Sequence, residues 1–162
     1  MIFEGLCVGN KVLTRALLTA PRVTLSERRI GWERLEGAAW TLSLMTSLRE
    51  LDLSCNTLEH ERPRPGQVQE ALPAKTRAFL ALQKARTVEA LSGALAGMSS
   101  LHTLDLWCNN LRYEQIEALE PNIPSGLVHL SFGHNFLLGP DGAIALGPLL
   151  ERLTNLEYLN LP

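Results

Sequence analysis

The chain has 162 residues, a hydrophobic fraction of 46%, a charged fraction of 20% and a formal net charge of −2. These values are typical of one folded globular domain and exclude an intrinsically disordered chain. Because the charge is near neutral and no long basic stripe is present, we expect no nucleic-acid partner.

Targeting signals and membrane spans are not indicated. No window approaches the ~18 apolar residues that a membrane span requires. Glu4 and Lys11 interrupt the N-terminal segment, which therefore does not resemble a secretory signal. The three cysteines, Cys7, Cys55 and Cys108, are too few for a secreted disulfide scaffold. We expect a cytoplasmic protein without a membrane partner.

In chain order, residues 1–19 are expected to form an N-terminal cap, with a helix over residues 12–18. Residues 20–30 then place Ala20, Val23, Leu25 and Ile30 at positions one, four, six and eleven of an eleven-residue frame. This frame recurs more clearly downstream, where the ninth residue is asparagine; here that position holds Arg28. The segment is expected to be a degenerate first copy of a repeat.

The frame recurs as LxxLxLxxNxL at residues 48–58 and 101–111, and at 127–137 with Phe132 in one leucine slot. A further copy opens at residues 156–161 and is truncated. The LxL pair predicts a short strand whose leucines point inward, because side chains alternate along a strand. The asparagine amide can satisfy backbone groups at the turn that follows. Three asparagines are therefore expected to form a structural ladder: Asn56, Asn109 and Asn135.

The segments between the strands have a helical spacing of apolar residues. Residues 142–156, 90–101 and 38–48 overlay in the same register. Trp40 lies in the last of these segments, and we expect it to belong to the core.

Residues 59–89 interrupt the pattern, because Leu48 and Leu101 lie 53 residues apart, close to two periods. A degenerate repeat could contribute a strand with Leu80 and Leu82 as its inward pair. Alternatively, the segment is an insertion and the strands on either side pair directly. We favour the degenerate repeat. An intervening strand would hold Cys55 and Cys108 beyond disulfide reach, so we expect two free, partly buried thiols.

These motifs resemble leucine-rich repeats, and the helical segments with spacings of 26 and 29 residues resemble the ribonuclease-inhibitor type. The sensor regions of nucleotide-binding immune receptors are similar. The resemblance implies an α/β leucine-rich repeat solenoid over residues 20–162: a right-handed βα superhelix and short arc, with a parallel concave sheet and convex helices.

Strand residues that face away from the core line the concave face, the main binding face in this family. Three rows are expected there, the third holding Ser26, Ser54, Trp107 and Gly133. Trp107 is not required by packing at its position, and it is either a binding anchor or an indole lying over neighbouring side chains. The expected partner-binding residues are Glu50, Asp52, Thr103, Asp105, Trp107, His129, Ser131 and Tyr158.

No catalytic motif, metal site or cofactor site is recognisable. His129, His134 and Asp105 could be imagined as a cluster, but we interpret the histidines as surface residues. The expected function is that of a non-enzymatic module that binds a protein partner on its concave face. Alternatives are a regulator of a small GTPase, as in the Ran GTPase-activating proteins, and a truncated repeat fragment without an independent role. Further repeats or another chain are expected to cover the C-terminal edge.

Overall fold

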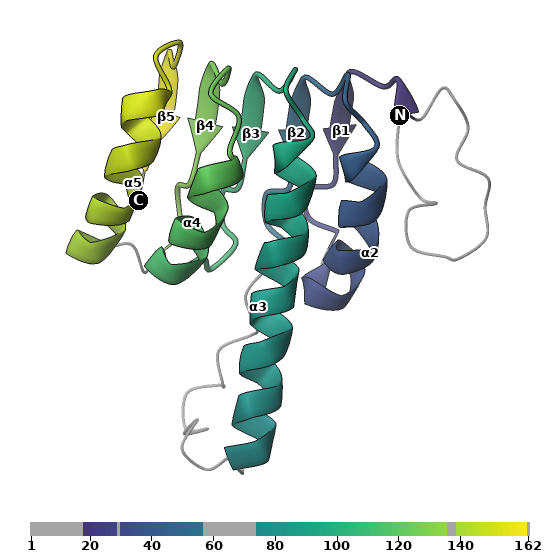
Figure 1. The fold of residues 1–162 in the computed structure, drawn as a ribbon, viewed down its shortest axis with the longest axis vertical. Helices are drawn as coiled ribbons and strands as arrows, with labels where there is room; N and C mark the ends of the chain where they lie inside the picture. The colour runs from purple at the N-terminus through teal and green to yellow at the C-terminus, as the bar shows by residue number, and fades with distance from the viewer. Residues whose placement is uncertain (1–17, 29, 57–73, 136–138, 162) are drawn as a thin grey trace.

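The computed structural model describes residues 18–28, 30–56, 74–135 and 139–161. Within these residues, five short strands form one parallel sheet in chain order (Figure 1). Each strand pairs with the next in register, so the repeats stack side by side. The strands are β1 (Arg22–Thr24), β2 (Glu50–Asp52), β3 (Thr103–Asp105), β4 (His129–Ser131) and β5 (Tyr158–Asn160).

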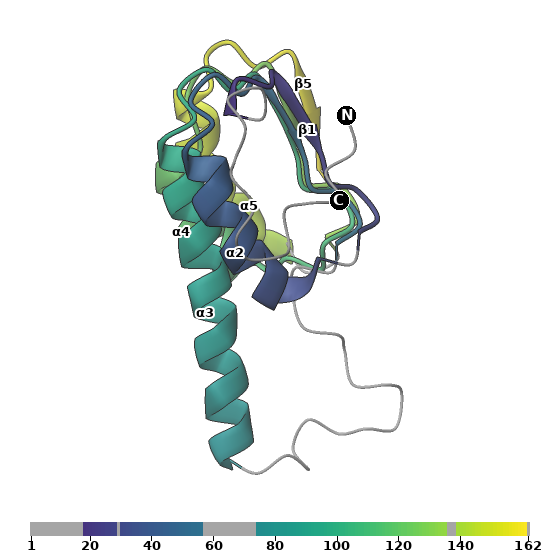
Figure 2. The same ribbon diagram turned by 90° about the vertical axis from the view of Figure 1, so that its right-hand side faces the viewer.

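Four α-helices in the described segments connect the strands, and all of them lie on one face of the sheet (Figure 2). The other face, which we call the open face, carries none of these helices. This mixed α/β architecture is consistent with the expected leucine-rich repeat fold. The helices are α2 (Gly31–Ser43), α3 (Ala74–Ala96), α4 (Tyr113–Leu119) and α5 (Gly139–Arg152), and a 3₁₀ turn, η2 (Glu120–Asn122), follows α4.

The inward residues of the strands form the core between sheet and helices. In β2, Leu51 and the following Leu53 are completely buried, and Leu104 and Leu106 repeat this arrangement one strand further on. Burying a leucine side chain contributes about 1.5–3 kcal/mol, and the stacked repeats bury many of them in equivalent positions. The leucine pairs therefore hold the sheet against the helices and leave the alternate residues on the open face.

Three buried asparagines connect the turns of successive repeats. The backbone N–H of Asn56 donates to Oδ1 of Asn109 at 2.9 Å, and that of Asn109 donates to Oδ1 of Asn135 at 3.0 Å. The side-chain amide of Asn109 donates to the carbonyl oxygen of Leu53 at 3.0 Å. Each asparagine side chain thus provides hydrogen bonds to backbone groups of the neighbouring turn that would otherwise be unpaired. This makes the turn geometry uniform from repeat to repeat.

Helix α2 packs through Leu35, Ala38, Ala39 and Leu42, which are buried at the spacing of one helical face. Trp40 lies away from that stripe and is 65% exposed. The expectation that Trp40 belongs to the core is therefore wrong. The segment is apolar enough to suggest burial, but the helical phase turns the indole to solvent.

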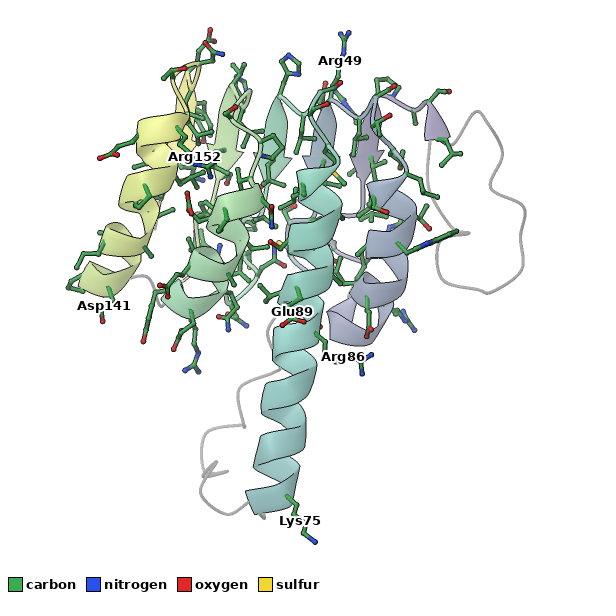
Figure 3. The ribbon with its side chains drawn as sticks, in the orientation of Figure 1. Arg49, Lys75, Arg86, Glu89, Asp141 and Arg152 are labelled. Atoms are coloured by element: carbon green, nitrogen blue, oxygen red, sulfur yellow. The ribbon has the colours of Figure 1, made fainter. Side chains whose placement is uncertain are left out.

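The favoured reading of residues 59–89 is also wrong, because β2 pairs directly with β3, with Glu50 opposite Thr103. Residues 80 and 82 belong to α3, a helix of 23 residues, and not to a strand. This helix extends beyond its neighbours, with Lys75 near its far end (Figure 3). Near the stack, Arg86 of α3 forms an ion pair with Glu36 of α2 at 3.1 Å.

Some sequence-based expectations concern residues outside the described ranges. The N-terminal cap over residues 1–19 lies almost entirely outside them, as do residues 59–73 and Cys7. Those expectations stay predictions.

Candidate functional site

The outward side chains of the five strands line up in rows on the open face. The register brings Glu50 beside Thr103, Thr103 beside His129, and His129 beside Tyr158. A second row runs through Asp52, Asp105, Ser131 and Asn160 in the same way. Seven of the eight candidate residues are at least partly exposed, and Ser131 is buried.

The two aspartates of the second row also act on the backbone. Oδ1 of Asp52 accepts hydrogen bonds from the backbone N–H of Ser54 at 3.0 Å and from its hydroxyl at 2.7 Å. Oδ1 of Asp105 accepts the backbone N–H of Trp107 at 2.9 Å. Each carboxylate therefore fixes the turn two residues downstream, as aspartate commonly does. The spacing Asp-x-Ser and Asp-x-Trp was a signal for this role, which the sequence analysis missed.

The negative charge of Glu50, in the first row of the open face, is partly balanced by a basic neighbour. Nε of Arg22 lies 2.6 Å from a carboxylate oxygen of Glu50, its cross-strand neighbour. The hydrogen bond to Glu50 and the charge of that carboxylate raise the pKa of the Arg22 guanidinium. Glu50 consequently presents less free negative charge to a partner than its sequence position indicates.

Trp107 is partly buried and lies over the neighbouring repeat. A Cβ atom placed on Gly133 would come within 2.6 Å of Nδ2 of Asn160 and 2.8 Å of Cδ1 of Trp107, so these two side chains together occupy the space that a side chain would fill there. The indole also meets the ring of His134 edge-on, with centroids 4.7 Å apart. These two neighbours hold the ring in place and leave part of it exposed. The repeat frame predicts that Trp107 and Gly133 share a row, but it predicts neither their contact nor the role of His134.

A second aromatic pair lies at the other end of the first row. The rings of His129 and Tyr158 have centroids 5.7 Å apart, and both side chains are exposed. His129 and His134 thus each meet a different aromatic ring. Among the residues that the structure describes, no group of three or more His, Cys, Asp or Glu is placed to hold a metal ion.

A family model described as Leucine Rich Repeat matches residues 47–67. These residues contain β2 and the turn of Asn56, one of the two copies that match the frame without a mismatch. The match supports a leucine-rich repeat protein. Leucine-rich repeats generally mediate protein–protein interaction and are generally not enzymes. No curated protein and no solved structure matches the chain.

No helix within the described ranges is long and apolar enough to cross a membrane.

Proposed function

We propose that this chain is a non-enzymatic module that binds a partner protein on the open face of its sheet. The partly exposed Trp107, held by Gly133 and His134 among rows of polar side chains, carries this proposal. Tryptophans that are fixed in place and only partly covered contribute strongly to protein interfaces. The proposed contact residues are Glu50, Asp52, Thr103, Asp105, Trp107, His129 and Tyr158; Ser131, which the sequence also suggested, is buried and is not among them.

The proposed architecture is a right-handed βα solenoid of the ribonuclease-inhibitor type, with the open face on its concave side. The helix-bearing repeats and their spacing support this subfamily. Such a sheet presents its side chains in a preset geometry, which lowers the entropy that a binding partner must lose. We place the module in the cytoplasm, without nucleic acid or membrane as a partner.

The charges of the open face favour a partner of mixed charge. Asp52 and Asp105 are partly exposed, whereas Glu50 is paired with Arg22. A partner that offers an apolar pocket for the indole and a few basic or hydrogen-bonding groups around it fits this arrangement. Further repeats or another chain are proposed to cover the exposed edge of β5.

The test compares the intact chain with two tryptophan variants, Trp107→Ala and Trp40→Ala. Trp40 is the matched control, because it is an exposed tryptophan on the helical side of the sheet. Each immobilised protein is used to capture binders, and the affinity of each candidate is then measured with purified components. Circular dichroism establishes that both variants remain folded.

We expect Trp107→Ala to weaken binding by about 30-fold, the effect of losing an interface residue worth about 2 kcal/mol. Trp40→Ala should leave the affinity unchanged. Equal affinities for the intact chain and a folded Trp107→Ala variant would remove Trp107 from the binding site. If binding were lost with Trp40→Ala and kept with Trp107→Ala, the binding site would lie on the helical side of the sheet.

A further inference from the structure

Cys55 and Cys108 occupy the same position in two adjacent repeats, directly after β2 and β3. The backbone N–H of Leu53 donates to the carbonyl oxygen of Asp105, and that of Cys55 to the carbonyl oxygen of Trp107, each at 2.9 Å. The ladder bond from the N–H of Asn56 follows at once. The two turns therefore run side by side through the cysteines.

This pairing sets the separation of the two cysteines. Adjacent strands lie ~4.8 Å apart, and disulfides join residues whose Cα atoms are ~4.4–6.8 Å apart. With an intervening strand the spacing would be doubled, but β2 and β3 are direct neighbours. Both cysteines are free and only partly buried, so a reagent in solution can reach them.

The turn itself does not require sulfur at this position. Glu27 and His134 occupy it in the flanking repeats, and the backbone of all four residues is left-handed, with φ between 54° and 56°. A left-handed conformation favours glycine or asparagine, so cysteine has no conformational advantage there. The paired thiols are thus a chemical feature of the site and not a packing requirement.

The two sulfurs interact. Burial, then the hydrogen bond and charge of Cys108, and smaller effects of Glu27 and Asp105 together raise the pKa of the Cys55 thiol to about 11. The Cys55 thiol therefore keeps its proton at neutral pH. In such a pair one sulfur attacks the oxidant and the other resolves the product, and their equivalent positions allow either cysteine to take the first role.

We propose that Cys55 and Cys108 form a dithiol site that hydrogen peroxide closes into a reversible disulfide between the β2 and β3 repeats. The sulfur of one cysteine attacks one peroxide oxygen, the O–O bond breaks, and hydroxide leaves and takes up the thiol proton as water. The thiol of the other cysteine then loses its proton and attacks the sulfur of the sulfenic acid. The S–O bond breaks and a second water leaves, so that two thiols are oxidised and one peroxide is reduced.

The bridge is expected to be labile. Side chains at equivalent positions of parallel neighbours project side by side, ~4.8 Å apart, whereas disulfide Cβ atoms prefer ~3.8 Å. Closing the bridge must draw the two turns together, and strained disulfides are reduced readily. An added dithiol such as dithiothreitol should therefore reopen it.

The test uses the full chain with Cys7→Ser, which removes the third thiol. One equivalent of hydrogen peroxide is added to the folded protein, and free thiols, intact mass and cross-linked peptides are measured. We expect both thiols to disappear together, the mass to fall by two hydrogen atoms, and a peptide pair linking Cys55 to Cys108. Dithiothreitol should restore both thiols.

Two matched variants test whether the bridge needs both thiols. With Cys55→Ser or with Cys108→Ser, no second thiol is left to resolve the product, so oxidation should stop at a sulfenic acid that dimedone traps. If the starting protein with both cysteines instead forms only links between chains, or gains oxygen atoms on each sulfur without a bridge, the proposal is wrong.

Discussion

The middle and the end of the sheet carry the same leucine pattern but bury it differently. Leu104 and Leu106, beside β4, are completely buried, whereas Leu159 of β5 and Leu161, which follows it, are 36% and 40% exposed. The difference shows that a leucine in this frame is covered mainly by the next repeat. Stability in such an array is therefore a property of the contact between neighbouring repeats.

The strongest test of this comparison removes one leucine from each place. Leu104→Ala should lower the free energy of unfolding by about 2–5 kcal/mol, because it leaves a cavity in a closed core. Leu159→Ala should lower it by about 1 kcal/mol, since much of that side chain already contacts water. Urea unfolding followed by circular dichroism measures both values. Equal losses would mean that the β5 repeat is packed as tightly as the middle.

The asparagine ladder gives the next largest effect. Asn109→Ala should cost about 2–3 kcal/mol, because the buried N–H of Asn56 loses its acceptor and the buried carbonyl of Leu53 loses a donor. Asn155→Ala is the control, since Asn155 is exposed in the turn before β5. The same urea titration applies. A loss at Asn155 as large as that at Asn109 would contradict the ladder's role.

A smaller effect is expected where Trp107 crosses to the next repeat. Gly133→Ala should cost about 1 kcal/mol, because the new methyl group pushes against the indole and against Asn160. Adding Trp107→Ala should relieve part of this cost, so the two changes should be coupled in a double-mutant cycle. Strictly additive losses would show that the indole does not rest on Gly133.

The smallest effect is expected at the surface pair of Arg22 and Glu50. Both side chains are largely exposed, and exposed ion pairs contribute little to stability. Arg22→Gln should leave the urea midpoint nearly unchanged, and the small difference should disappear in high salt. A large shift that persists in salt would show that this pair organises the first repeat.

The strands could be located from the sequence because the frame repeats: LxL marks both the inward pair and, by alternation, the outward rows. The degenerate copy at Ala20 was confirmed as β1 for the same reason. Residues 59–89 could not be resolved in this way. Leu80 and Leu82 fit a strand pair as well as a helix, and only the direct pairing of β2 with β3 decides between them.

The site was predictable in outline but not in detail. Which residues share a row follows from the frame, whereas the contact of Trp107 with Gly133 and His134 depends on how far a side chain reaches across repeats. Trp40 was wrongly expected in the core, because an apolar helical segment does not by itself show which side of the helix faces the core. The hydrogen bonds from backbone N–H groups to Asp52 and Asp105 depend on the geometry of the turns, which the sequence does not give.

The left-handed turn position has a consequence for how this protein can change over time. The same backbone geometry holds a carboxylate at Glu27, thiols at Cys55 and Cys108, and an imidazole at His134. A point mutation there changes the reactive group of one repeat and does not require the backbone of the flanking repeats to change. The side chains at this turn position can therefore change during evolution one repeat at a time, while the backbone of the sheet and its turns stays the same.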